Sequence, residues 1–319
     1  MNCSLHLSLP LSPLIALILI SNATAQAQPG VEFKGSSKLQ VIVDKVANET
    51  LAKFAAKKLE TNQLAITFVD LSETAKPQWA SFRGDVQIYP ASVIKLFYLV
   101  AAHRWMEDGK LKDTEELRRA MKDMIVESLN EATGLIVDSL TDTTSGPELP
   151  PAELEKWYEK RNAVNRYFTS IGYKNINVNR KPWCEGPYGR EMQSVKLHTP
   201  NHRNWLTTEA TARIMTEIAS GRAVNADRSA QMMQLLERQP LESKTGGQSR
   251  DYTGMALPQG SKLWSKAGWT SEARHDAAYV ELPTGERFVL VTFTMGHASD
   301  KEIIATVARS IIAEFTAAK

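Results

Sequence analysis

An almost wholly apolar run that begins directly after a serine and a lysine is the feature that most constrains this chain. Residues 96–102 read LFYLVAA and follow Ser92 and Lys95, which form the motif S-x-x-K. This spacing places the hydroxyl and the amine one turn apart on the same face of a helix. A helix that is apolar on all sides lies in a protein core, so we expect Lys95 to be buried.

The pairing of a buried lysine with a serine favours nucleophilic catalysis. A serine hydroxyl is a poor nucleophile at neutral pH unless a nearby base removes its proton. A lysine amine acts as that base only where burial or a neighbouring cation lowers its pKa from about 10.4. Because S-x-x-K also occurs by chance in many chains, the motif alone does not establish an enzyme.

Strand patterns occur near both ends of the chain, and helical patterns fill its middle. Residues 114–218 are predicted to be mainly helical, apart from a polar loop over 141–151 and a long irregular stretch over 175–200. Amphipathic helices are predicted over 39–59 and 302–315. The predicted strands are 64–70, 79–87, 262–266, 277–282 and 288–295.

This order of elements predicts an α/β fold of the α+β type. We expect an antiparallel five-stranded sheet flanked by the two terminal helices, together with a mainly helical lobe. Residues 28–319 form a single catalytic domain in this interpretation. Its sheet lobe comprises residues 28–88 and 255–319, and its helical lobe comprises residues 89–254.

Two further segments belong with the serine and the lysine. Residues 128–130 read Ser-Leu-Asn, and residues 266–268 read Lys-Ala-Gly after the stretch LPQG at 257–260. With S-x-x-K, they resemble the S-D-N and K-T-G motifs of the serine β-lactamase and penicillin-binding protein superfamily, in the same order. The resemblance is closest to the class A β-lactamases, in which a Leu-Pro-x-Gly stretch precedes the K-T-G strand. A literal K-T-G at Lys244 has no strand after it, so we assign the third motif to Lys266.

The resemblance implies a role for each motif residue. Ser92 would attack a carbonyl carbon and form an acyl-enzyme, while Lys95 would accept its proton or hold the network that does so. The backbone N–H groups of Ser92 and Trp269 would form the oxyanion hole. Ser128 would relay a proton to the leaving nitrogen, and Asn130 would bind the acyl-amide side chain of the substrate. Lys266 would keep Lys95 neutral and attract the substrate carboxylate. Gly268 and Thr270 would belong to the substrate-binding segment.

The sequence departs from the class A pattern within two of its motifs. Ala267 replaces the hydroxyl residue of K-T-G, which removes a hydrogen-bond donor to the substrate carboxylate. Thr270 or Ser271 would have to compensate for this loss. Leu129 replaces the central acid of S-D-N, a change that several branches of the superfamily share.

The long loop carries the most consequential departure. Class A enzymes have there an E-x-x-L-N signature, whose glutamate activates the deacylating water, and this chain lacks it. Glu185, between a tryptophan and a proline, is the best substitute, and Glu191 is the second. The alternative is that both residues are surface acids in a loop rich in glycine and proline.

Three functions follow from these expectations. The first is hydrolysis of β-lactam rings through an acyl-enzyme at Ser92. The second is a D-Ala-D-Ala carboxypeptidase like the penicillin-binding proteins, or an esterase, that is acylated by β-lactams and deacylates slowly. The third is a non-catalytic cell-wall-binding protein, against which the intact Ser92, Lys95 and Lys266 argue. The partner would be a β-lactam or a peptidoglycan stem peptide, and we expect a monomer.

The remaining sequence features bear on location and ligands. Residues 14–20 form an apolar core too short to span a bilayer, and small-x-small patterns follow it, so residues 1–27 are predicted to be a signal peptide of a secreted or periplasmic protein. After cleavage Cys184 is the single cysteine, which excludes an intramolecular disulfide. The net charge of +2 comes from well-mixed acids and bases, which argues against nucleic acid or a membrane surface. His198 and His202 are separated by Pro200, so we expect no metal site and no cofactor.

Overall fold

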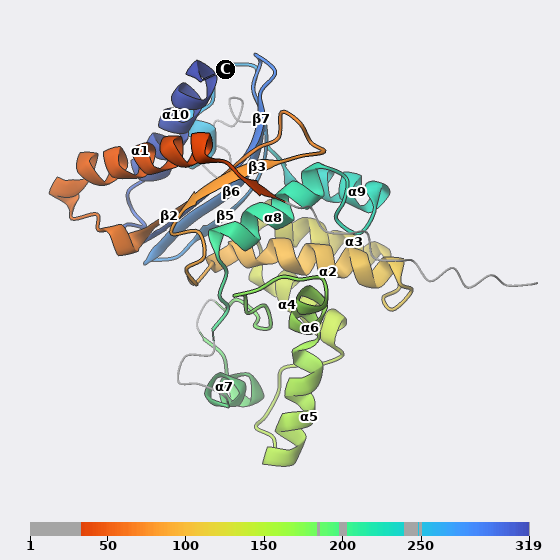
Figure 1. Cartoon of the computed structure of the whole chain (residues 1–319). Helices are drawn as coiled ribbons and strands as arrows, with labels where there is room; N and C mark the ends of the chain where they lie inside the picture. Colours follow the sequence, from red (N-terminus) through yellow and green to blue (C-terminus); the bar gives the residue numbers. More distant parts are fainter. Residues whose placement is uncertain (1–32, 184–185, 198–202, 239–247, 249–250, 319) are drawn as a thin grey trace, which may run out of the picture.

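The computed structural model describes residues 33–183, 186–197, 203–238, 248 and 251–318. It shows a sheet with helices on both of its faces (Figure 1). Outside the described residues lie the expected signal peptide (1–27), Cys184, Glu185, His198, His202 and the literal K-T-G at Lys244, so the corresponding expectations stay predictions.

The sheet has seven strands rather than the expected five, and it is mixed rather than antiparallel throughout. The five predicted strands form its centre in the order β3-β2-β7-β6-β5, and these are antiparallel to one another. The edge strands β1 and β4 have two residues each, and β1 pairs with β3 in parallel. Two residues are too few to show an alternating pattern, which is why the prediction of a five-stranded antiparallel sheet was wrong. The strands are β1 Lys34–Gly35, β2 Leu64–Asp70, β3 Gln78–Phe82, β4 Glu237–Arg238, β5 Lys262–Trp269, β6 Ala273–Glu281 and β7 Arg287–Met295.

Strands β5 and β6 are longer than the sequence predicts. Their ladder runs without interruption from the pair Lys262 and Glu281 to the pair Trp269 and Arg274. The additional residues are mainly small or charged rather than β-branched, so pairing with the neighbouring backbone, and not side-chain propensity, forms this part of the sheet. The extension brings the whole Lys-Ala-Gly motif onto a strand.

Both faces of the sheet are covered, so its central strands are buried on two sides. On β2, Ile66 and Phe68 pack with the terminal helices, whereas Ala65 and Val69 belong to the core shared with the helical lobe. Figure 1 shows α1 and α10 together on one face and α8 on the other. These helices are α1 Ser37–Lys53, α8 Thr208–Ala219 and α10 Glu302–Ala317.

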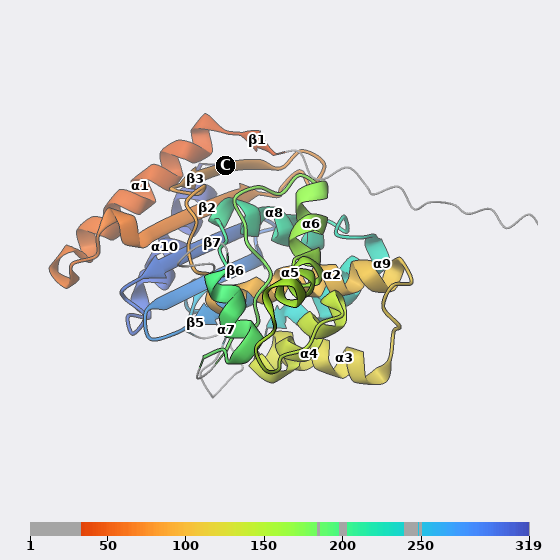
Figure 2. The same cartoon turned by 90° about the horizontal axis from the view of Figure 1, so that it is seen from below.

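Helix α2 (Lys95–Glu107) lies on the same side of the sheet as α8. Figure 2, which views the molecule from below, shows it among the helices that cover this face. It is buried over most of its length, as its apolar sequence predicts. None of the helices in the described part of the chain is long and apolar enough to cross a membrane. The other helical elements are α3 Glu115–Lys122, the π-helix η4 Asp123–Glu127, α4 Asn130–Thr141, α5 Pro151–Arg161, α6 Ala163–Ser170, α7 Gly189–Lys196, α9 Ala226–Leu236, and the 3-10 helices η1 Ala55–Lys57, η2 Thr61–Gln63, η3 Ala91–Ile94 and η5 Thr253–Ala256.

Candidate active site

Ser92 lies on a strained turn rather than on the regular helix that its sequence predicts. It belongs to the 3-10 helix η3, and α2 begins only at Lys95. The residue before it, Ala91, has a φ of 46°, in the left-handed region that residues with a side chain rarely adopt. Such residues cost about 1–3 kcal/mol each and cluster at functional sites. The turn also leaves Ser92 partly exposed, whereas its helical neighbours are buried.

Strand β5 passes close to this turn, and Gly268 makes the approach possible. A Cβ atom at Gly268 would lie 2.7 Å from the carbonyl oxygen of Pro90 and 3.0 Å from the backbone nitrogen of Ser92. Any side chain at this position would therefore push the strand away from the serine. The backbones of Ser92 and of the end of β5 are neighbours, as an oxyanion hole formed by the N–H groups of Ser92 and Trp269 requires.

The amine of Lys95 is fully buried and joins the first two motifs. Its Nζ donates to the backbone oxygen of Ser128 at 2.6 Å and to Oδ1 of Asn130 at 3.0 Å. It also lies 3.3 Å from the hydroxyl oxygen of Ser128. The structure therefore brings Lys95, Ser128 and Asn130 into direct contact, as the motifs predict.

The amine of Lys266 reaches the same hydroxyl from strand β5. Its Nζ lies 2.9 Å from Oγ of Ser128, 2.9 Å from Oε1 of Gln248 and 2.7 Å from the backbone oxygen of Ala267. Burial lowers the pKa of Lys266 well below its usual value, and the neighbouring cation of Lys95 lowers it further. Two amines that share one hydroxyl favour the loss of one proton, which leaves a free base beside Ser128.

Gln248 is a member of this site that the sequence did not reveal. Its Oε1 accepts from Nζ of Lys266 and, at 3.0 Å, from the backbone N–H of Ala267. Its Nε2 donates to the backbone oxygens of Ile125 and Val126, at 3.1 and 2.9 Å, at the end of the π-helix η4. It thus connects the end of η4, which directly precedes the second motif, to the third motif. No local sequence pattern around position 248 signals this contact. We call Lys95, Ser128, Asn130, Gln248 and Lys266 the lysine cluster.

The backbone at Ser128 explains how its hydroxyl reaches both lysines. The sequence places Ser128 on a helix, but η4 ends at Glu127, and Ser128 itself has a φ of 60°. Helix α4 then begins at Asn130. Because of this break, the carbonyl of Ser128 faces Lys95 and its hydroxyl lies near both amines. In a continuous helix the carbonyl would instead accept a hydrogen bond from within the helix.

Thr270 does not lie where a substitute for the missing hydroxyl of Ala267 would be expected. Its Oγ1 accepts from the backbone N–H groups of Glu272 and Ala273, at 3.2 and 3.0 Å, and so caps the turn between β5 and β6. Its backbone N–H also donates to the carbonyl of Ala273. Thr270 therefore shapes the hairpin that follows Trp269.

A cavity of about 600 Å³ opens beside the lysine cluster. This volume lies within the range of about 300–1,000 Å³ that is usual for small-molecule sites. Its lining includes Asn130 and Leu135 from α4 and, from the long loop, Lys181, Trp183 and Tyr188.

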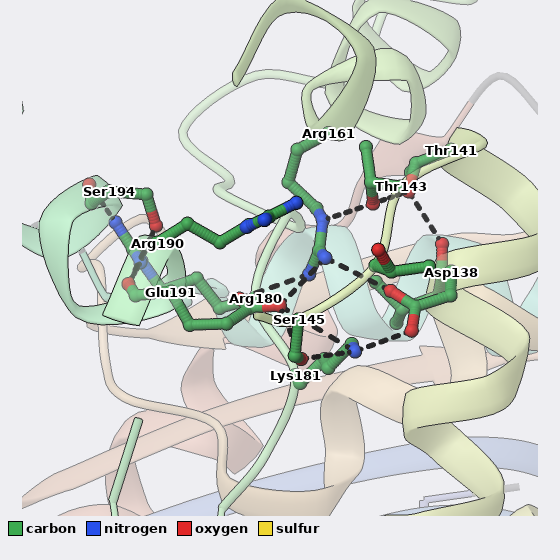
Figure 3. Close-up of polar contacts among 12 residues, drawn as sticks. Asp138, Thr141, Thr143, Ser145, Arg161, Arg180, Lys181, Arg190, Glu191 and Ser194 are labelled. Carbon is green, nitrogen blue, oxygen red and sulfur yellow. Dashed lines mark hydrogen bonds and ion pairs between the residues drawn. The ribbon is translucent and has the colours of Figure 1, made fainter. Parts of the chain in front are cut away.

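Glu191, the second candidate for the deacylating acid, belongs to a separate group of buried charges. Its carboxylate receives two hydrogen bonds from the guanidinium of Arg161, at 2.8 and 3.2 Å, and one from the hydroxyl of Ser145 at 3.0 Å. The side chains of Arg161 and Glu191 are 2% and 3% exposed, so this ion pair is almost completely removed from water. Figure 3 shows the pair at the centre of a network that joins α5, α7 and α4.

Lys181 and Asp138 complete this group. The amine of Lys181 lies 2.6 Å from Oδ2 of Asp138, 2.8 Å from Oγ of Ser145 and 3.6 Å from Oε1 of Glu191. Asp138 also accepts from Arg161 at 3.0 Å, and burial raises the pKa of Asp138 (Figure 3). We call Asp138, Ser145, Arg161, Lys181 and Glu191 the loop cluster, because it holds the long loop against the helical lobe.

The structure brings most of the predicted site residues together. The amines of Lys95 and Lys266 meet at the hydroxyl of Ser128, and Lys95 also contacts Asn130. Gly268 lies against the turn that carries Ser92, whereas Glu191 is bound in the loop cluster. Glu185 lies outside the described residues. Chemically, the arrangement offers a serine on a strained turn, two buried amines and a neighbouring cavity, which suits acyl transfer.

The fold is shared with solved structures of low sequence identity. PBP-A is 18% identical, with a TM-score of 0.63, and the match covers 91% of this chain and 99% of that one. A mutant of PBP-A, solved as an acyl-enzyme complex with penicillin G, matches with the same TM-score and 17% identity over 91% of this chain and 99% of that chain. A β-lactamase from Sphaerobacter thermophilus is 20% identical, with a TM-score of 0.63 and coverage of 86% and 98%.

The sequence comparisons agree with this likeness. No curated protein sequence matches the chain. A sequence model of the β-lactamase enzyme family, in contrast, matches residues 113–315, which is more than half of the chain and includes the second and third motifs. The chain therefore belongs to the β-lactamase enzyme family.

Proposed function

We propose that this protein is a secreted or periplasmic serine hydrolase of class A β-lactamase type, which opens β-lactam rings through an acyl-enzyme at Ser92. The observation that carries the proposal is the hydroxyl of Ser128, which lies within hydrogen-bonding distance of the buried amines of both Lys95 and Lys266. Burial and mutual repulsion favour one neutral amine in such a pair, and a neutral amine is the base that a serine nucleophile needs.

The acylation step follows from this arrangement. The Oγ of Ser92 attacks the lactam carbonyl carbon while its proton passes to the amine of Lys95. The N–H groups of Ser92 and Trp269 stabilise the resulting oxyanion. Ser128 then gives its proton to the lactam nitrogen, the C–N bond breaks, and Ser128 regains a proton from the lysine pair. The product is an ester on Ser92 and a protonated ring nitrogen, with no net loss of protons.

Substrate binding would use the groups that surround this hydroxyl. Lys266 would bind the carboxylate of the substrate, whose negative charge favours the charged form of this amine and so leaves Lys95 as the neutral base. Gln248 would hold the amine of Lys266 in place in the absence of a hydroxyl at Ala267. Asn130 would bind the acyl-amide group, whose side chain would enter the cavity beside Leu135 and Trp183. We expect the protein to act as a monomer.

Deacylation separates this function from its alternative. A carboxylate that activates water speeds hydrolysis of the ester by about 10²–10⁴-fold. In our proposal Glu185 supplies that carboxylate. Glu185→Gln should then leave acylation nearly intact and trap the acyl-enzyme, whereas unchanged deacylation would discard this assignment.

One observation favours the second candidate, a D-Ala-D-Ala carboxypeptidase or esterase that β-lactams acylate persistently. Among the described residues of the stretch 175–200, Glu191 is the one acid, and Arg161 and Ser145 occupy its carboxylate. If Glu185 is not placed to activate water either, the ester on Ser92 will hydrolyse slowly. The natural substrate would then be a peptidoglycan stem peptide.

Mass spectrometry of the intact protein after mixing with benzylpenicillin tests the proposal. A transient adduct that decays as penicilloate appears would support the β-lactamase function, and a persistent adduct would support the carboxypeptidase or esterase. Ser92→Ala should form no adduct and should remain folded, because the change removes one hydroxyl. An adduct on Ser92→Ala would overturn the assignment of Ser92 and move the nucleophile to another residue. No adduct on the natural protein would overturn acylation by β-lactams, and would mean a different substrate or a non-catalytic cell-wall-binding protein.

A further inference from the structure

The turn that carries Ser92 needs an external restraint. Pro90 has no N–H to donate, and Ala91 is held in the left-handed region at a φ of 46°. Within the turn itself, the backbone N–H of Val93 donates to the carbonyl of Pro90 at 3.1 Å. One such bond does not determine where the turn lies relative to β5, which supplies the other half of the oxyanion hole.

His275 supplies a bond from the sheet to this turn. It lies on β6 directly opposite Gly268 of β5, and its Nε2 is 2.8 Å from the carbonyl oxygen of Tyr89. The side chain of Tyr89 is held as well, because the guanidinium of Arg203 lies 4.6 Å from the centre of its ring. The chain is thus fixed two residues before the strained Ala91.

The second ring nitrogen determines which way the hydrogen bond runs. Nδ1 of His275 accepts from the backbone N–H of Thr294 on β7 at 3.1 Å. A backbone N–H can only donate, so Nδ1 carries no proton and the hydrogen of the neutral ring must be on Nε2. Nε2 therefore donates to Tyr89, whose carbonyl can only accept.

The surroundings keep this imidazole neutral and in place. The ring is completely buried and lies against the ring of Phe293, with 4.4 Å between the two centres. Burial lowers the pKa of His275 to about 4, although the carbonyl of Tyr89 favours the charged form. At neutral pH the ring is a fixed hydrogen-bond donor and not an acid or base.

We propose that His275 is a positioning residue for acylation, which sets the distance between the turn of Ser92 and the strand that ends at Trp269. This inference rests on the proposed acylation at Ser92. The oxyanion hole takes one N–H from the turn and one from β5, and His275 joins the sheet to the turn at the level of Gly268. Displacement of a reacting group by about 1 Å lowers rates by about 10²-fold, so a single bond of this kind has a measurable effect on catalysis.

Two amide substitutions separate the two hydrogen bonds of the ring. The amide of Asn at position 275 can still accept from Thr294, because it reaches about as far as Nδ1, but it does not reach Tyr89. The longer Gln can place its amide nitrogen near the position of Nε2 and donate to Tyr89. His275→Asn should therefore lower the first-order acylation rate by benzylpenicillin about 10²-fold. His275→Gln should recover most of that rate.

The two variants are compared by stopped-flow acylation and by thermal unfolding. We expect the dissociation constant of the complex that precedes acylation to stay within a few-fold of the natural value in both variants, because the bond acts on the geometry of attack. The inference is overturned if both variants acylate at the natural rate. It is equally overturned if both lose rate in proportion to lost thermal stability, since the ring would then be structural only.

A second probe keeps this test separate from the proposed function. A fluorophosphonate phosphonylates an activated serine whatever its natural substrate, forming an O–P bond as fluoride leaves and the proton passes to the base. If benzylpenicillin does not acylate the natural protein, the proposed function fails. A phosphonylation rate that is far lower in His275→Asn than in His275→Gln would still support the role of His275. Equal phosphonylation rates in both variants would overturn it.

Discussion

The lysine cluster and the loop cluster both bury cations, and they differ in how the charge is balanced. In the loop cluster, Arg161 and Lys181 contact the carboxylates of Asp138 and Glu191 at 2.6–3.6 Å. In the lysine cluster, the hydrogen bonds described for Lys95 and Lys266 go to neutral oxygens of hydroxyl, amide and backbone groups.

This difference indicates that the hydrogen-bonding partner, and not the residue type, determines whether a buried lysine or arginine stays charged. A buried ion pair keeps its cation charged, and it strongly destabilises the fold when one partner is removed. Neutral oxygens compensate burial only in part, so the pKa of Lys266 falls well below its usual value. The loop cluster is therefore suited to holding the loop, and the lysine cluster to moving a proton.

The largest expected effect is the loss of the base. Lys95→Ala should slow acylation of Ser92 by about 10²–10⁴-fold at neutral pH, because the serine then loses the amine that accepts its proton. Raising the pH should recover only part of the rate. The measurement is the rate of adduct formation with benzylpenicillin in stopped flow. A variant that acylates at the natural rate would remove Lys95 from the mechanism.

The corresponding change in the loop cluster should act on stability instead. Arg161→Met leaves the carboxylate of Glu191 buried without its main partner, so we expect a loss of about 3–5 kcal/mol in the free energy of unfolding. Denaturation in urea measures this loss. Adding Glu191→Gln to Arg161→Met should restore part of it, because the unpaired charge is then gone. Full additivity of the two changes would show that the ion pair is not the reason.

An intermediate effect is expected at Asp276, which partly balances the lysine cluster from β6. Burial raises the pKa of Asp276 to about 6, and its charge raises that of Lys266. Because the folded pKa lies above that of the unfolded chain, the contribution of Asp276 to stability is present below about pH 4 and is lost as the pH rises through 6.

The test at Asp276 is a comparison across pH. Asp276→Asn cannot lose a proton, so its stability relative to the natural protein should increase by about 2–3 kcal/mol between pH 4 and pH 7. Urea denaturation at several pH values measures this difference. A constant difference across that range would mean that Asp276 titrates in the folded protein as it does in the unfolded chain.

The sequence correctly predicts those elements whose hydrophobic pattern matches the way they pack in the fold. The apolar run after Lys95 is a buried helix, and the three motifs lie in the expected order around one site. The five central strands also follow from alternation and composition. The edge strands β1 and β4 do not, because two residues carry no period.

The contacts that complete the site depend on chain segments that are distant in sequence. Gln248 reaches Lys266 and the end of η4 from a part of the sequence without a local pattern. His275 meets Tyr89 across 186 positions, and it does so only because β6 continues beyond the range that its residues predict. The φ of Ser128 is likewise set by packing, since serine has no preference for the left-handed region.

The smallest effect should come from Glu191 itself, and it bears directly on the comparison of the two clusters. Glu191→Gln keeps the shape of the side chain and an oxygen that accepts from Arg161, while Asp138 remains as the carboxylate partner of both Arg161 and Lys181. Hydrogen bonds to charged groups are worth about 1.5–3 kcal/mol, and the amide retains part of that, so we expect a loss of about 1–2 kcal/mol in unfolding free energy. The rate at which the acyl-enzyme on Ser92 hydrolyses should stay within about twofold of the natural rate, since the carboxylate is occupied by Arg161 and Ser145 and does not activate water. Single-turnover kinetics with benzylpenicillin measures this rate. An acyl-enzyme trapped by Glu191→Gln would move the general base to Glu191 and would mean that the loop cluster opens during the reaction.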